Sequence, residues 1–229
     1  RLRQGRPAVT VKLAQTADGF AARRLGPRLM ITGEATQARV HLLRAHCDAL
    51  LVGVGTVLAD DPMLTVRLPG LEGRSPVRIV FDTGLRTPAR SRIAASARDH
   101  PTWIVTTPAA SPAAERALTA AGVEVMRVET AAPGRVDLRA ALGLIATRGI
   151  TRILCEGGPT LADALAAADL IDEVVLATAP QRLGEAGLPA IGRLAPLLRT
   201  RFAPLPRETL GADLIETFER MEKPCSPGL

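Results

Sequence analysis

The residues best suited to chemistry lie at positions 153–161, in the stretch ILCEGGPTL. Three apolar residues followed by an acid, two glycines and a proline predict a strand that ends in a tight loop and opens a helix. Gly157 and Gly158 would let a ligand approach the backbone, and Pro159 suits a first helical turn whose N–H groups attract an anion. Taken alone, a Gly-Gly-Pro segment is more often a plain turn. The stretch predicts a phosphate-binding loop only in combination with the rest of the chain.

Two ionisable side chains, Glu156 and Lys12, are candidates for proton transfer. Glu156 directly follows the predicted strand, at the edge where open α/β sheets bind their ligands. Lys12 lies within an apolar strand, so its ammonium must reach solvent or a counter-charge to avoid a large desolvation cost. We expect Glu156 to supply that counter-charge across the sheet.

A second stretch, GVGTVLADDPMLTVR at positions 53–67, follows another buried strand. After the strand come small residues, an acidic pair followed by a proline, and a final arginine. This composition is unusual for a plain connection between a strand and the next element, and it predicts a binding loop. Asp60 and Asp61 fit equally well as ordinary turn and cap residues. Arg44 and Arg67, each taken singly, are ordinary surface arginines.

The composition favours a small anionic ligand. The chain has 229 residues, of which 47% are hydrophobic, so it can bury one core, and we expect a single domain. Its 29 basic and 23 acidic residues give a net charge of +6, scattered along the chain and not gathered in blocks. Aromatic residues make up only 2%, so the stacking surface of a single-strand nucleic-acid binder is missing.

The three cysteines, Cys47, Cys155 and Cys225, share no short spacing, so we expect neither a disulfide framework nor a metal site. No stretch approaches the roughly 20 apolar residues of a membrane span, and no signal segment opens the chain. We expect a cytoplasmic protein that contacts no membrane.

Hydrophobic periodicity predicts alternating strands and helices, and therefore a sheet with crossover helices. The expected strands are residues 8–14, 49–55, 77–82, 102–107, 123–128, 151–155 and 172–178, and the expected helices are residues 34–46, 112–121, 138–147 and 160–168. Thr32 is the expected N-cap of the first helix. After residue 178 we expect no further helix, and residues 201–218 read as two strands that form an antiparallel hairpin edge.

Four segments together resemble a known family. They are RPAVTVKLAQTADG, RVHLLRAHCDALLVGVGTVLADDPMLTVR, PVRIVFDTGLRTP and ILCEGGPTLADALAAADLIDEV, and they closely resemble the reductase domain of the bacterial riboflavin-biosynthesis protein RibD. The resemblance covers residue 6 to about residue 218. It implies a dihydrofolate-reductase-like, three-layer α/β/α fold, with a mostly parallel central sheet ending in an antiparallel C-terminal hairpin.

The resemblance also implies an activity: NADPH-dependent reduction of the ribosyl group of 5-amino-6-(5-phosphoribosylamino)uracil to ribityl. A zinc deaminase domain precedes the reductase in the bifunctional proteins, but this sequence has neither HxE nor PCxxC. Residues 1–6 resemble the junction to such a domain, and residues 220–229 look like a flexible tail. We expect a homodimer, with a deaminase domain or protein acting upstream.

Carried over by position, the resemblance implies the site residues. It implies NADPH contacts from Ala14, Met30, Thr56, Asp60, Thr83, Gly158, Pro159, Thr160, Leu161, Ala162, Asp163 and Ala164. It implies substrate contacts from Arg28, Arg44, Leu64, Arg67 and Glu156. A sugar phosphate carries nearly two negative charges, which suits paired arginines. Lys12 and Glu156 are the expected catalytic pair, with acid and base unassigned, and residues 86–92 are expected to meet the 2′-phosphate of NADPH.

The sequence departs from the family pattern in one segment. Where the family has the form SxWIT, this chain reads Arg28-Leu29-Met30-Ile31-Thr32. Met30 offers an apolar, polarizable surface in place of the indole ring. Arg28 is either a third cation for the phosphate or a sign that the substrate differs.

Two alternatives therefore stay open. One is a paralogous NADPH-dependent reductase of the same fold that acts on a pterin, dihydrofolate or another imine. The other is a nucleotide-binding protein without turnover. The sequence contains Lys12, Glu156, Arg44 and Arg67 together, which argues against the nucleotide-binding protein. A protein that only binds the nucleotide does not need the residues that contact the substrate.

Overall fold

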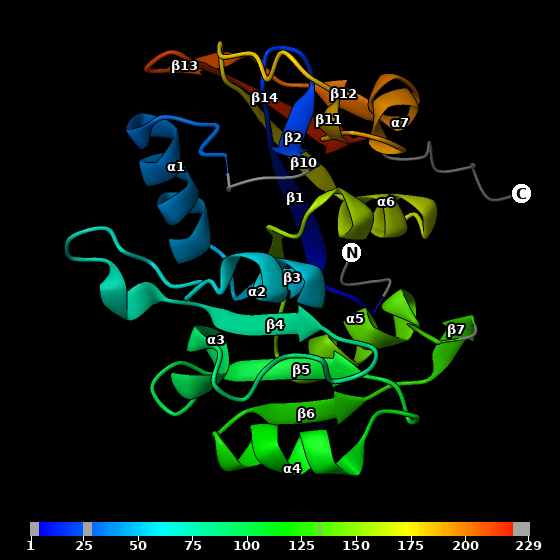
Figure 1. Ribbon diagram of the computed structural model, residues 1–229. Coiled ribbons are helices and arrows are strands. Elements are labelled where there is room, and N and C mark those ends of the chain that lie inside the picture. Colours follow the sequence, from blue (N-terminus) through cyan, green and yellow to red (C-terminus); the bar gives the residue numbers. More distant parts are fainter. Residues whose placement is uncertain (1–4, 25–28, 133, 222–229) are drawn as a thin grey trace, which may run out of the picture.

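A long, mostly parallel sheet forms the centre of the protein (Figure 1). The computed structural model describes residues 5–24, 29–132 and 134–221. In that part the strand order is β12-β14-β10-β1-β9-β3-β4-β5-β6. The parallel strands are β1 (Ala8–Gln15), β3 (Ala49–Gly53), β4 (Val77–Phe81), β5 (Thr102–Thr106), β6 (Glu124–Arg127), β9 (Arg152–Cys155) and β10 (Glu173–Thr178).

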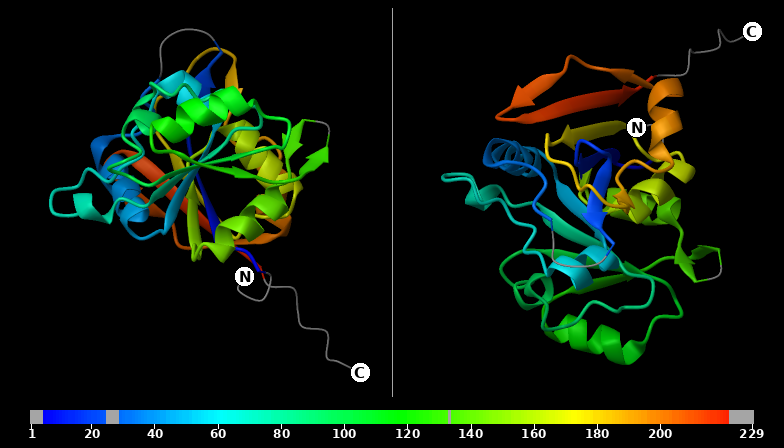
Figure 2. Two further views of the ribbon diagram at one scale, coloured as in Figure 1. Left: turned by 90° about the horizontal axis from the view of Figure 1, so that it is seen from below. Right: turned by 45° about the horizontal axis from the view of Figure 1, so that its top comes forward.

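Helices cover both faces of this sheet, because successive strand residues point to opposite sides. Leu51 packs in one apolar core with α5 (Leu138–Thr147), α6 (Pro159–Ala167) and α7 (Leu194–Thr200). Its neighbour Leu50 packs in the other with α2 (Val54–Asp60), α3 (Arg92–Ala95) and α4 (Pro112–Ala120). Figure 2 shows α1 (Glu34–Ala45) and α6 on opposite sides of the twisted sheet. The predicted three-layer α/β/α architecture is confirmed.

The C-terminal strands form an antiparallel edge, as predicted. β14 (Asp213–Arg220) runs antiparallel to β10, and β12 (Phe202–Pro204) and β13 (Glu208–Leu210) pair with β14. Two small sheets lie outside the main one: β2 (Phe20–Arg23) pairs with β11 (Gly187–Pro189), and β7 (Thr130–Ala132) pairs with β8 (Arg135–Val136). A short 3-10 turn, η2 (Glu72–Arg74), completes the described elements.

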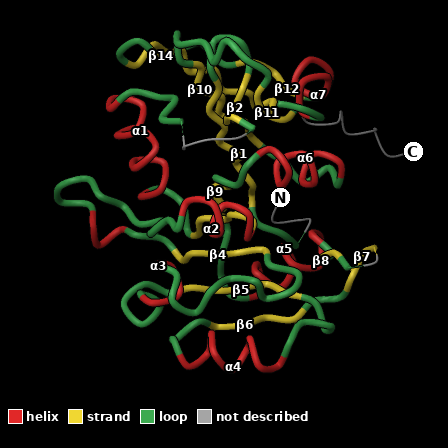
Figure 3. The backbone as a smooth tube through the Cα atoms, in the orientation of Figure 1, coloured by secondary structure: helices red, strands yellow, loops and turns green. Residues whose placement is uncertain are grey.

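Three helices were not expected from the sequence: the four-residue α3, and the longer α7 and α2 (Figure 3). α7 lies where no further helix was expected, and its start is fixed by Asp163, which accepts the backbone N–H of Arg193 at 2.7 Å. α2 replaces the first half of the expected binding loop, with Gly53 as its N-cap. Both helices have only seven residues, so hydrophobic periodicity gives them little signal.

The N-cap prediction for α1 is also wrong. Gly33, not Thr32, occupies that position, and no side chain of the cap residue bonds to the helix. Instead the carboxylate of Asp213, from β14, accepts the Gly33 N–H at 2.8 Å and the Thr36 hydroxyl at 2.6 Å. The N–H at the helix start thus donates to a side chain 180 positions away in the sequence. This contact fixes α1 against the C-terminal edge of the sheet.

A buried ion pair fixes the start of β1. Arg6 donates to both carboxylate oxygens of Asp172, at 2.6 and 2.9 Å, and the side chains are 4% and 5% exposed. Asp172 also accepts the Val9 N–H at 2.9 Å.

Among the described residues, no helix combines the length and apolar character needed to cross a bilayer.

Candidate functional site

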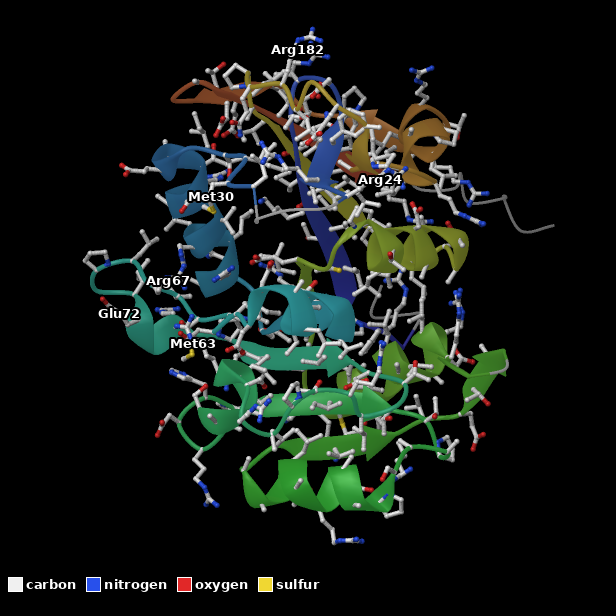
Figure 4. The ribbon with its side chains drawn as sticks, viewed as in Figure 1. Arg24, Met30, Met63, Arg67, Glu72 and Arg182 are labelled. Atoms are coloured by element: carbon white, nitrogen blue, oxygen red, sulfur yellow. The ribbon has the colours of Figure 1, made fainter. Side chains whose placement is uncertain are left out.

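A cleft of about 550 Å³ lies where β1 and β9 end and α6 begins. Its other walls are α1, the end of α2 and residues 29–32. Figure 4 shows Met30 and Arg67 on the side where α1 lies. The position agrees with the predicted one, because open α/β sheets bind ligands beyond the carboxyl ends of their strands.

Glu156 and Arg44 form the strongest interaction in the cleft. Glu156 follows β9 directly, and Arg44 donates from Nε and Nη2 to its two carboxylate oxygens, both at 2.7 Å. The side chains are only 11% and 13% exposed, so this bidentate pair is largely desolvated. Arg44 is therefore a partner of Glu156 that the sequence analysis did not predict, and the charge of Lys12, the predicted partner, also favours the ionised form of Glu156.

The pair determines the charge state of Glu156. Burial raises the pKa of a carboxyl group, but the hydrogen bonds and charge of Arg44, together with the charge of Lys12, lower the pKa of Glu156 below its ordinary value. Glu156 is therefore a carboxylate at neutral pH. It can accept a proton or hold a cation, but it has none to donate.

Arg44 also connects two walls of the cleft. Its Nη1 donates to the carbonyl of Thr65 at 2.9 Å, so α1 is joined to the segment that follows α2. Most of its donors are thus used within the protein. Arg67 lines the same cleft and is exposed, which makes it the more accessible cation for a ligand.

Residues 61–67 are held in a strained conformation. Asp61 and Leu64 have φ values of 39° and 53°, in the left-handed region that favours glycine. The Asp61 carboxylate accepts the N–H of Arg92 at 2.7 Å, and the buried Arg78 donates to the Met63 carbonyl at 3.0 Å. The same guanidinium donates to three carbonyls and two hydroxyls between residues 93 and 102, and burial lowers the pKa of Arg78 to about 10.

The start of α6 has the geometry of an anion cradle. Gly158 is its N-cap, with extended backbone (φ −65°, ψ 179°), and a Cβ placed there would meet nothing within 4 Å. A Cβ at Gly157 would meet Leu161 Cδ2 at 2.7 Å. Protein packing therefore requires glycine at 157 but leaves open space in front of 158. That space, at the positive end of the helix dipole, fits a phosphate-bearing cofactor.

The structure brings most of the predicted residues together. The cleft is lined by Lys12, Ala14, Met30, Arg44, Asp60, Arg67, Glu156, Gly158 and Pro159. Arg28 lies outside the described residues. The remaining predicted residues are not among those that line the cleft: Thr56, Leu64, Thr83, Thr160, Leu161, Ala162, Asp163 and Ala164.

Three of these have a clear structural role instead. Leu64 is buried in the core on the face of α2 to α4, so its side chain is not available to a substrate. Ala162 is buried on the inner face of α6. The Asp163 carboxylate is engaged at the start of α7. Ala162 lies in the core because helical periodicity turns one face of α6 inward.

His41 is a cleft residue that the sequence analysis missed. Its Nδ1 accepts the backbone N–H of Arg67 at 3.1 Å, and the ring lines the cleft. Burial, followed by the charges of Arg44 and Arg67, lowers the pKa of His41. The signal was present: in the HLLR sequence, His41 and Arg44 are three positions apart on a predicted helix and so share a face.

Comparison with known proteins agrees with this geometry. The family model described as the RibD C-terminal domain matches residues 7–215. The chain belongs to the RibD C-terminal domain family. The family resemblance seen in the sequence is therefore confirmed.

Relatives within the family carry two kinds of name. The chain is 39% identical over 180 residues to the 2,5-diamino-6-ribosylamino-4(3H)-pyrimidinone 5′-phosphate reductase of Methanothermobacter thermautotrophicus, covering 78% of this chain and 80% of that one. It is 34% identical over 197 residues to the riboflavin biosynthesis protein RibD of Bacillus amyloliquefaciens, covering 86% of this chain but 50% of that one. The chain thus spans about half the length of this RibD protein.

A solved structure shares the fold. It is the diaminohydroxyphosphoribosylaminopyrimidine deaminase/5-amino-6-(5-phosphoribosylamino)uracil reductase of Thermotoga maritima, with a TM-score of 0.75 and 25% identity. The match covers 96% of this chain and 58% of that one.

Proposed function

We propose that the protein is an NADPH-dependent oxidoreductase of riboflavin biosynthesis that reduces the ribosyl group of 5-amino-6-(5-phosphoribosylamino)uracil to ribityl. The observation that carries the proposal is the meeting, in one cleft, of an ionised Glu156, the cations Lys12 and Arg67, and an open helix start at Gly158. The names of the family relatives support the same reaction.

On the cofactor side, the N–H groups at the start of α6 would bind the pyrophosphate. Ala14, Met30 and Asp60 would line the rest of the cofactor site, and Thr56 on α2 and Thr83 after β4 remain proposed contacts. Bound NADPH would supply a hydride. Residues 86–92 carry exposed arginines, among them Arg86, and are the proposed source of preference for a 2′-phosphate.

On the substrate side, reduction requires the sugar ring to open to an imine, a hydride to add at C1′, and a proton to reach the nitrogen. Glu156 is ionised and cannot supply that proton. We assign the proton donor role to Lys12, and we assign Glu156 the role of holding Lys12 and Arg44 charged and in place. Arg67, and Arg28 from the segment outside the described residues, would bind the substrate phosphate.

A second substrate is favoured by one observation. The Methanothermobacter relative is named for the diaminopyrimidinone phosphate, which still carries the exocyclic amine that deamination removes. If this chain shared that substrate, reduction would precede deamination. In the proposed order, a deaminase domain or separate deaminase would act first.

The test is to give the protein NADPH and each ribosylaminopyrimidine phosphate in turn, and to follow the loss of absorbance at the nicotinamide band. We expect the higher kcat/KM with the uracil compound. A higher kcat/KM with the diamino compound would reverse the order of the two steps. Turnover of dihydrofolate or a pterin alone would contradict the proposed function.

A further inference from the structure

His41 makes a contact that fixes its tautomer. Its Nδ1 accepts the Arg67 N–H at 3.1 Å, and an accepting ring nitrogen carries no hydrogen. In the neutral ring the hydrogen must then lie on Nε2. The ring lines the cleft, three positions before Arg44 on α1.

The surroundings of His41 keep its ring uncharged. Burial and the positive charges of Arg44, on α1, and Arg67, after α2, lower its pKa. The negative charge of Glu156, after β9, and the carbonyl of Thr65 act in the opposite direction, with smaller effects. Lys12 on β1, Arg23 on β2 and Asp60 on α2 also line the cleft, and Arg23 is paired with Glu185 at 3.6 Å.

One competing arrangement is available to the ring. The Thr65 carbonyl can accept a hydrogen bond from the charged ring, which raises the pKa of His41, but burial and the charges of Arg44 and Arg67 have larger effects. Moreover, this carbonyl already accepts Arg44 Nη1 at 2.9 Å. The Arg67 N–H, in turn, needs an acceptor, and Nδ1 is the one the structure gives it.

We propose that His41 is a substrate-binding residue that works as a neutral imidazole: Nδ1 holds the backbone of Arg67 in place, and Nε2–H donates to the phosphate of the bound substrate. The inference rests on the proposed function, since it takes the anion in the cleft to be a sugar phosphate. It adds a neutral donor to the charged groups of the site. Protonation would put a hydrogen on Nδ1 and break the tie to Arg67, so acid would weaken substrate binding.

The first test reads the tautomer directly by 15N NMR of the imidazole rings, with ribose 5-phosphate as the probe. The chain has three histidines, so His41 can be assigned by its loss in His41→Asn, with His46 and His100 as internal references. We expect the Nε2–H form, a pKa below the ordinary value for histidine, and a shift of the Nε2 signal when ribose 5-phosphate binds. An Nδ1–H form, or a signal unchanged by saturating ribose 5-phosphate, would overturn the proposal.

The second test uses variants that separate the two nitrogens. His41→Asn places its oxygen near Nδ1, so it can still accept from Arg67 but offers no donor to the phosphate. We expect KM for the phosphorylated substrate to rise on the order of 10- to 100-fold, with kcat little changed. His41→Leu removes both contacts and should lower kcat as well. His46→Asn, at the exposed end of α1, is the matched control and should leave both parameters unchanged.

The pH profile gives a readout that a merely structural role would not affect. KM of the parent should rise as pH falls through the pKa of His41, while that of His41→Asn should stay flat in the same range. A parental KM in His41→Asn would refute the role of His41 and leave the proposed function intact. A parent that binds ribose 5-phosphate but does not turn over either pyrimidine would refute the proposed function instead.

Discussion

The charge state of Glu156 depends on one residue, Arg44. Glu156 and Arg44 could both be identified as site candidates from the sequence, because each belongs to a motif that resembles the family. Their pairing could not, since the two positions are 112 residues apart and each has a plausible partner elsewhere. For His41 the spacing to Arg44 showed which helix face it shares, but its contact with the backbone N–H of Arg67, 26 positions away, could not be predicted from the sequence.

Replacing Glu156 by Gln tests the residue-scale account of catalysis. The amide keeps the shape but removes the charge that holds Lys12 and Arg44, so we expect kcat to fall by roughly 10²-fold or more, with NADPH affinity retained. Steady-state kinetics and a cofactor titration would measure both. Glu115→Gln, in the surface pair with Arg127, is the matched control and should keep the parental kcat. Near-parental kcat in Glu156→Gln would show that catalysis does not depend on the charge of Glu156.

The lowered pKa of Glu156 also predicts how stability depends on pH. An unfolded glutamate titrates at about 4.3, and the folded one titrates lower, so the unfolded state binds more protons in between. The stabilisation is complete above that value and is lost as pH falls through the folded pKa. Urea unfolding below about pH 4.3 should therefore show a shallower pH slope for Glu156→Gln than for the parent. Equal slopes would mean that Arg44 does not stabilise the carboxylate.

At the scale of elements, the motif ILCEGGPTL was interpreted correctly: β9 ends, a glycine loop follows, and α6 starts at Pro159. No such signal marks α2, whose small residues resemble a loop, or α7, whose start depends on Asp163. Short helices that are fixed from a distance cannot be seen in local periodicity.

The two glycines before α6 should behave differently when substituted. Gly158→Val meets open space, so it should fold with parental stability but weaken NADPH binding by roughly 10-fold or more, because the side chain blocks the approach of the phosphate. Gly157→Ala should lose stability, since its Cβ would lie 2.7 Å from Leu161 Cδ2. Thermal unfolding and fluorescence titration separate the two effects. A Gly158→Val variant that binds NADPH as tightly as the parent would place the cradle elsewhere.

At the scale of the molecule, the periodicity predicted a mostly parallel sheet with an antiparallel C-terminal edge, and the structure confirms both. Apolar runs in the central strands are enough to indicate burial on two faces. What they do not indicate is how the chain start is fixed. That role belongs to Arg6 and Asp172, at the opposite end of β1 from Lys12 and the cleft.

Asp172→Ala would leave the buried Arg6 without its carboxylate. We expect the free energy of unfolding to fall by about 3–5 kcal/mol, while kcat/KM of the folded protein stays unchanged because the site is at the other end of the strand. Glu124→Ala breaks the exposed pair with Arg148 and should cost no more than about 1 kcal/mol. Chemical unfolding compares the two. A similar small cost for both would show that the Arg6–Asp172 pair does not fix the fold.

The central claim is that this cleft reduces a ribosylamino phosphate by hydride transfer. The most direct measurement uses NADPH deuterated at both C4 positions, with 5-amino-6-(5-phosphoribosylamino)uracil as substrate and mass spectrometry of the product. We predict a ribitylamino phosphate that carries deuterium at C1′, with NADPH consumed in equal amount. An unlabelled product, or NADPH and substrate that both bind without forming product, would contradict the claim.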